Sequence, residues 1–194
     1  MNTIRIQTLT EDYFEEAREI ENDFLADGKG FCFGCCPYSW CLMPQAGFAS
    51  MHRRDEDKCS RYGLAIKDDE QDQNGCNVLG IIKLRLGTTP SNWMQNTMYK
   101  VTNDELYIDL LAVRLEARGR GIGRQLLEWA ENQARNVYGV AKLTLGVTKG
   151  NRAKNLYTRF GFVQVKSHHA YSLVWGVGMP NGRFGASIME KMLT

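Results

Sequence analysis

A glycine-rich segment with three arginines has the composition of a phosphate-binding loop. It reads Arg118-Gly119-Arg120-Gly121-Ile122-Gly123-Arg124 and follows an apolar run over residues 106–113. Glycine lets the backbone approach a ligand closely, while the first amides of a helix lack intrahelical acceptors and lie at the positive end of the helix dipole. Such amides bind anions, and the arginines add full positive charge. The segment therefore predicts a site for a nucleotide-bearing cofactor with two or three phosphate groups.

This loop matches neither of the two common phosphate-binding fingerprints. The Gly-x-x-x-x-Gly-Lys-Ser/Thr pattern is absent, and only two of the three glycines of the dinucleotide-binding motif are matched. A tight strand-to-helix turn with solvated arginines is the alternative interpretation. Spacing alone leaves both open.

Two ordered motifs resemble the acyl-CoA-binding region of the GCN5-related N-acetyltransferase (GNAT) family. The first is Leu111-Ala112-Val113 followed by Arg118-x-x-Gly121-x-Gly123, and the second is Ala153-x-x-Leu156-Tyr157-x-x-x-Gly161-Phe162. Together they cover about residues 106 to 165 at family-like spacing. One departure is Gly150, which stands where the family usually has asparagine, with Asn151 one place later.

The resemblance implies a mixed α/β fold, in which helices flank a mostly antiparallel central sheet with one parallel, splayed strand pair. It also implies an N-acetyltransferase whose acetyl-CoA wedges between those two parallel strands. The positions that match the cofactor-binding motifs, with Asn151 as the displaced asparagine, are Leu111, Ala112, Val113, Arg118, Gly119, Arg120, Gly121, Ile122, Gly123, Arg124, Asn151 and Tyr157.

Acetyl transfer to an amine needs a neutral nucleophile, a polarised thioester carbonyl and a proton for the leaving thiolate. By the resemblance, the backbone amide of Leu111 polarises the carbonyl. Tyr157 is placed beside the cofactor sulfur, where we expect it to act as general acid. The alternative for Tyr157 is an aromatic core residue of a short amphipathic helix.

Asp109 is the candidate base, because it is the only charged residue in the predicted central strand. It stands two positions before Leu111, hence on the same face if the strand is regular, and burial would raise its pKa. A structural bond to backbone amides is the alternative. Glu105, expected at the solvent end of the strand, and a water chain are further candidates. Tyr107 occupies the position where histone-acetylating members have glutamate.

Length and charge fit one domain over residues 1–194. The chain has 43% hydrophobic residues and a formal net charge of +2. Its basic residues are spread along the sequence, which argues against a nucleic-acid partner. Apolar runs fall short of the roughly 20 residues that span a bilayer, and the first residues do not resemble a signal peptide. We expect a cytoplasmic protein without a membrane partner; a homodimer is compatible with the sequence.

Hydrophobic periodicity predicts the elements that position these residues. The predicted strands are 3–8, 62–67, 78–86, 106–113, 140–147, 162–166 and 187–193. One predicted helix begins at Thr10, and three others cover about residues 44–61, 122–138 and 151–160. The strand-helix-strand order over 106–147 predicts a right-handed crossover and a parallel pair.

Four cysteines, Cys32, Cys35, Cys36 and Cys41, lie in one aromatic-rich loop. Two of them are adjacent and no second Cys-x-x-Cys follows, so we predict no metal site. Buried thiols pack like small hydrophobic groups, and we expect this loop to line the acceptor site. A reversible disulfide between Cys32 and Cys41 is a minor alternative.

The preferred function is transfer of an acetyl group from acetyl-CoA to a primary amine of a small molecule. Segments 31–41, 87–104 and 167–185 are long and rich in aromatic residues, which suits an enclosed pocket, whereas peptide acceptors need an open groove. The alternatives are a protein N-terminal or lysine acetyltransferase and a non-catalytic acyl-CoA-binding regulatory module.

Overall fold

The computed structural model describes residues 4–26, 59–67, 77–89, 99–148, 150–168 and 186–193. Within them, seven strands form one sheet in the order β1-β2-β3-β4-β5-β7-β6. The strands are β1 (Ile4–Thr8), β2 (Tyr62–Lys67), β3 (Val78–Leu86), β4 (Glu105–Val113), β5 (Lys142–Thr148), β6 (Val163–His168) and β7 (Ala186–Met192). The helices that flank them are α1 (Phe14–Ala26), α5 (Ile122–Asn132) and α6 (Ala153–Phe160).

The mixed sheet expected from the resemblance is confirmed. Strands β4 and β5 run parallel, while the other neighbouring strands pair antiparallel. The predicted strands 62–67 and 78–86 match β2 and β3 residue for residue, and the other predicted strands differ from the observed ones by at most two residues at either end. Apolar runs and alternating segments in the sequence were therefore sufficient to find every described strand.

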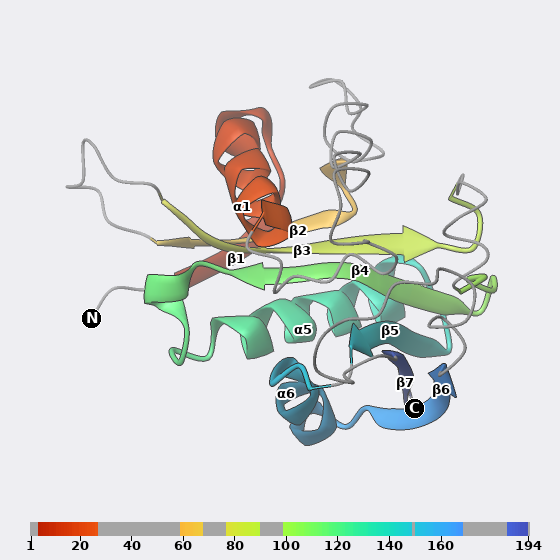
Figure 1. Cartoon of the computed structure of the whole chain (residues 1–194). Helices are drawn as coiled ribbons and strands as arrows, with labels where there is room; N and C mark the ends of the chain where they lie inside the picture. Colours follow the sequence, from red (N-terminus) through yellow and green to blue (C-terminus); the bar gives the residue numbers. More distant parts are fainter. Residues whose placement is uncertain are drawn as a thin grey trace.

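Helices cover both faces of this sheet (Figure 1). On one face, α1 buries Phe14, Ala17 and Ile20 in a cluster that includes Leu110 and Ala112 of β4. On the other face, α5 and α6 share a larger cluster with β4, β5 and β7. In β2 the two clusters use alternate residues, with Leu64 and Ile66 in one and Ala65 in the other, as the pleat of a regular strand requires.

The helix predicted over residues 122–138 is wrong in its last turns. Helix α5 ends at Asn132 and continues as a π-helical turn, Gln133–Val137, before Gly139 reverses the chain with a φ of +60°. The wider turn rotates later residues off the buried face. A regular α-helix would place Val137 on the same face as the buried Ala130 and Ala134, but Val137 is 62% exposed.

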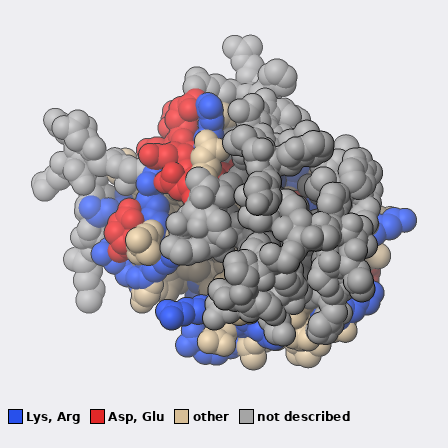
Figure 2. Space-filling model, viewed as in Figure 1, with Lys and Arg blue, Asp and Glu red and all other residues tan. Residues whose placement is uncertain are grey.

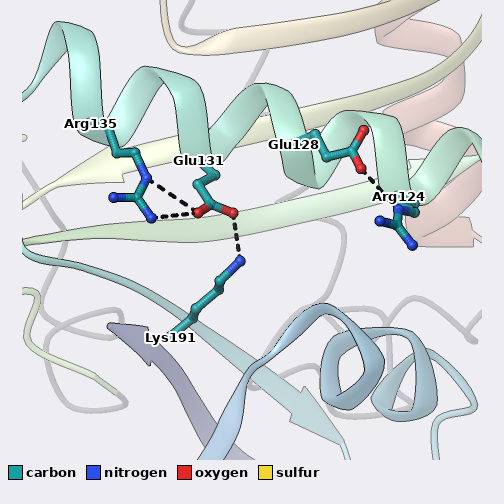
Figure 3. Close-up of polar contacts among 5 residues, drawn as sticks. All are labelled: Arg124, Glu128, Glu131, Arg135 and Lys191. Carbon is teal, nitrogen blue, oxygen red and sulfur yellow. Dashed lines mark hydrogen bonds and ion pairs between the residues drawn. The ribbon is translucent and has the colours of Figure 1, made fainter. Parts of the chain in front are cut away.

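A salt-bridge network fastens the end of α5 to β7 (Figure 3). The Glu131 carboxylate lies 2.6 Å from Lys191 Nζ and 2.8 Å from Arg135 Nη2. Lys191 Nζ also lies 4.1 Å from the centre of the Phe160 ring in α6. These contacts join three elements that are distant in sequence.

Several predictions fall outside the described residues. They concern the four-cysteine loop, most of the segments 44–61 and 167–185, and half of the segment 87–104. Thr10 does stand at the start of the first helical turn, Glu11–Tyr13, but its side chain makes no capping hydrogen bond. None of the described helices is long and apolar enough to cross a membrane.

The contact between α5 and β2 gives a test of the packing. A Cβ atom at Gly63 would lie 2.6 Å from the Trp129 ring, so Gly63→Ala should lower the free energy of unfolding by about 1–3 kcal/mol through overpacking. In a Trp129→Leu background the same change should cost less. Urea denaturation of the four proteins of this cycle measures both effects; additive losses would contradict the contact.

Candidate active site

Strand β4 loses its partner β5 halfway along its length. Residues 105–108 of β4 pair with residues 142–145 of β5. Beyond them, β4 continues to pair with β3 as far as Val113, whereas residues 146–148 of β5 pair only with β7. The second half of β4 therefore has one edge without a strand partner in the described part of the chain. This is the splayed pair that the resemblance implied.

The main chain of Leu111 and Val113 faces this open edge. Arg114 N–H donates to Leu79 O of β3 at 2.8 Å, and main-chain groups of successive residues point to opposite edges of a strand. The groups of Leu111 and Val113 are therefore directed away from β3. Arg118 Nε supports this direction, because it donates to Val113 O at 3.0 Å from outside the sheet.

A bulge interrupts β4 at the point where the strands part. Lys83 of β3 is opposite Leu110, but the next residue, Leu84, is opposite Ile108, so Asp109 is the extra residue. After the bulge the faces exchange: Leu110 belongs to the α1 cluster, and Leu111 packs against the α5 cluster. The expectation that Asp109 shares a face with Leu111 is thus wrong, because it assumed a regular strand.

Asp109 is held by a buried arginine of β3. Arg85 Nε donates to Asp109 Oδ1 at 3.0 Å, and the two side chains are 7% and 18% exposed. The guanidinium carbon of Arg85 also lies 4.8 Å from the centre of the Tyr107 ring. Burial raises the pKa of the Asp109 carboxyl above its ordinary value, although the positive charges of Arg85 and Lys83 act in the opposite direction.

Glu105 is fully buried, which corrects the expectation of a solvent-exposed carboxylate. Its Oε1 accepts hydrogen bonds from the amide and the hydroxyl of Thr102, and its Oε2 accepts one from Tyr99 at 2.8 Å. Tyr99 in turn stacks on Tyr107 at 5.2 Å between ring centres. The carboxylate therefore anchors the segment that enters β4, which leaves Asp109 as the more accessible of the two candidate bases.

The loop after β4 has the backbone that an anion site needs. Gly119 and Gly121 have φ angles of +80° and +82°, and a Cβ atom at either position would meet nothing within 4 Å. The Gly121 carbonyl accepts from the amides of residues 124 and 125, which starts α5. The amides of residues 119–123 donate to no acceptor among the described residues. They are available to a ligand.

The three arginines of this segment are not equivalent. Arg118 is bonded to Val113 O, and Arg124 Nε lies 2.9 Å from Glu128 one turn along α5 (Figure 3). Arg120 is exposed, and no ion pair is found for it within the described residues. In Figure 2 basic side chains mark the surface at the end of β4 and the loop that follows, next to the acidic surface of α1. Among the described residues, Arg120 is the one of the three for which no hydrogen bond or ion pair is found, so its whole guanidinium is open to a phosphate.

Helix α6 packs against the start of α5. A Cβ atom at Gly123 would lie 3.1 Å from the end of the Leu156 side chain, so a larger residue at this position would press on α6. The neighbouring Tyr157 is buried and meets Phe162 edge to face, with ring centres 6.1 Å apart. Burial raises the pKa of the Tyr157 hydroxyl to about 12. Asn151 Oδ1 accepts the Ala153 amide at 2.9 Å, so this side chain helps to start α6.

Sequence reasoning missed the charged partners of Asp109. Arg85 and Lys83 alternate with apolar residues in β3, and Lys83 Nζ lies 3.5 Å from Glu21 Oε1 of α1. Lys83 and Arg85 stand two residues apart in an otherwise apolar strand. This pattern was a visible signal of acidic partners nearby, because buried charges need partners. The partner for Arg85 is the acid that the bulge turns toward the same face.

The comparisons with known proteins agree with this geometry. The sequence model described as the acetyltransferase (GNAT) family matches residues 5–162. No curated protein matches the sequence. The ribosomal-protein-S18-alanine N-acetyltransferase from Escherichia coli is similar in structure, with 21% identity, a TM-score of 0.60 and coverage of 99% of this chain and 95% of that chain.

Two structures that contain coenzyme A are similar to the same extent. The paia N-acetyltransferase from Thermoplasma acidophilum in complex with coenzyme A has 17% identity and a TM-score of 0.61, and the alignment covers 98% of this chain and 99% of that chain. The NatC complex bound to Gag peptide and CoA has 20% identity and a TM-score of 0.63, with full coverage of both chains. At these identities the likeness concerns the fold.

A charge placed in the glycine loop tests the proposed anion site. Gly121→Glu directs a carboxylate into the space beside the free amides, and affinity for coenzyme A should fall at least about 100-fold. Gly139→Glu is the matched control, because Gly139 has a positive φ and open space around its Cβ position but follows the π-helical turn after α5, away from the glycine loop. Titration calorimetry measures the affinity. If a folded Gly121→Glu protein bound coenzyme A as tightly as the wild type, the assignment of the anion site to this loop would be wrong.

Proposed function

Because the chain belongs to the acetyltransferase (GNAT) family, in agreement with the resemblance of its motifs, we propose that it transfers an acetyl group from acetyl-CoA to a primary amine of a small molecule. Family membership makes it an acyltransferase. One observation carries the proposal for the site: β4 leaves β5 after Ile108, and its open edge leads directly into a loop of free amides.

The described residues fit acetyl-CoA. The main-chain groups of Leu111 and Val113 suit the amides of a pantetheine arm, which needs donors and acceptors along an extended chain. The amides of residues 119–123 and the Arg120 side chain suit the diphosphate. The side chain of Ala112 is buried in the cluster under α1, and that of Ile122 in the cluster under α5. They would position the two segments without touching the polar groups of acetyl-CoA.

Each of three residues around the open edge has a separate role in the transfer of the acetyl group. Acetyl-CoA supplies the acetyl group as a thioester, whose carbonyl carbon bonds to the amine nitrogen while its bond to sulfur breaks. Asp109, with its raised pKa, accepts the proton that the amine loses. The Leu111 N–H donates to the carbonyl oxygen as negative charge develops there. Tyr157, which is protonated at neutral pH, gives a proton to the departing sulfur.

A small acceptor suits the polar groups beside the open edge. Arg85 and Asp109 are mostly buried, so a compact polar molecule can reach and desolvate them more readily than a segment of a folded protein. Release of coenzyme A, measured with small amines and with peptides that have free N-termini, tests the acceptor class. Faster turnover with peptides would replace the small-molecule proposal by protein acetylation.

The role of Tyr157 has its own test. Tyr157→Phe removes a donor that is used only as the thiolate leaves, so kcat should fall by about 10- to 1000-fold with little change in affinity for acetyl-CoA. Tyr138→Phe is the control, because it removes a hydroxyl just after the π-helical turn that follows α5. This variant should leave kcat unchanged. Steady-state kinetics and calorimetry give both quantities. Equal losses of affinity and rate would make Tyr157 a packing residue.

A further inference from the structure

We infer that Arg85 and Asp109 together recognise the acceptor, and that this acceptor is an amine that also carries a carboxylate, as an amino acid does. The inference rests on the proposed function and specifies its substrate class. Asp109 would bind the ammonium group of the acceptor before that group loses its proton. Arg85 would bind the carboxylate of the same molecule.

The Arg85 guanidinium is fixed in place but only partly used. Its Nε donates to Asp109 Oδ1 at 3.0 Å, and its central carbon lies over the Tyr107 ring, 4.8 Å from the ring centre. Among the described residues, its Nη1 and Nη2 atoms have no acceptor. A guanidinium with two unused terminal nitrogens is suited to bind a carboxylate through two parallel hydrogen bonds. Since the side chain is already ordered, little conformational entropy is lost on binding.

The pair also lies where an acceptor must arrive. Asp109 is the bulge residue, the first residue of β4 beyond its last pair with β5, Ile108 with Leu145. An amine that attacks a thioester held at the open edge therefore approaches next to Asp109. Because Arg85 touches Asp109, a positive and a negative group of one small molecule can contact both side chains at the same time.

The other cations around Asp109 are less suited to this role. Lys83 is engaged with Glu21 Oε1 at 3.5 Å and lies over the Tyr62 ring. Arg61 donates to the Thr89 hydroxyl at 3.4 Å. Among the cations that the structure describes on this face, Arg85 is thus the one that combines burial, a fixed position and unused donors. This set of charges favours a zwitterion over a simple amine.

Paired amines that differ only in the carboxylate test the inference. We compare β-alanine with β-alaninamide, and alanine with alaninamide, by release of coenzyme A from acetyl-CoA. The wild-type protein should show about 10- to 100-fold higher kcat/KM for at least one carboxylate-bearing member, the range expected for hydrogen bonds between charged groups. Propionate should inhibit competitively against that amine. Both measurements use the unmodified protein and do not depend on the folding of a variant.

Substitution of Arg85 assigns the preference to this residue. Arg85→Lys keeps a positive charge beside Asp109 but cannot form the two parallel bonds, so the ratio of kcat/KM between the carboxylate-bearing amine and its amide should fall by about tenfold or more, while the affinity for acetyl-CoA changes little. Arg135→Lys is the control, because it alters the exposed ion pair between Arg135 and Glu131. This variant should keep the preference for the carboxylate-bearing amine.

The outcomes separate the two proposals. Turnover that is equal or faster with the amides would overturn the recognition of a carboxylate while leaving the acetyltransferase intact. A preference that Arg85→Lys retains would also overturn the inference. No release of coenzyme A with any amine or peptide, from a protein that binds acetyl-CoA, would remove the proposed function and this inference with it.

Discussion

The architecture depends on a strand that cannot pair with both neighbours along its whole length. An extra residue at position 109 shifts β4 against β3, and β4 parts from β5 at the same point. Buried main-chain groups need hydrogen-bond partners, so the open edge at Leu111 and Val113 favours a ligand with its own donors and acceptors. The bulge also decides which side chains face which layer: Leu111 packs toward α5, and Asp109 is turned to the face of α1. One backbone irregularity thus separates the side on which an acyl carrier would bind from the side on which an acceptor would arrive.

The polar groups on the α1 face reduce stability in exchange for chemistry. Burying charge is costly even when it is paired, and Arg85, Lys83 and Glu21 are all largely buried. Glu21 Oε2 is buried without a hydrogen-bond partner among the described residues. An apolar layer would stabilise the sheet more. Such an arrangement is characteristic of a functional site, where pKa values are set by burial and by neighbouring charge. The opposite face is conventional by comparison, with α5 and α6 packed on apolar strand residues.

Much of the fold could be predicted from the sequence, because it follows from periodicity and from local motifs. Two largely apolar segments joined by a polar turn located β2 and β3 with the correct ends, and the glycines of the loop located the start of α5. The errors arose where a regular element was assumed: the bulge at Asp109 and the π-helical turn that exposes Val137. Neither leaves a pattern in the side chains. Glu105 was misplaced for a different reason, since its burial depends on Thr102 and Tyr99, which close over it from the preceding segment. The cations of β3 were visible in the sequence, but the assignment of Arg85 to Asp109 requires the strand register, which a single sequence does not contain.

The account stands on the claim that the open edge of β4 and the loop after it form one continuous binding surface. Hydrogen exchange of individual amides, followed by NMR with and without acetyl-CoA, tests this most directly. Saturating acetyl-CoA should slow exchange of the Leu111 and Val113 amides together with those of residues 119–123, because each would gain an acceptor. The Gly80 and Ile81 amides of β3 should change little, if at all. Slower exchange in the loop alone, or protection confined to another part of the sheet, would contradict the claim.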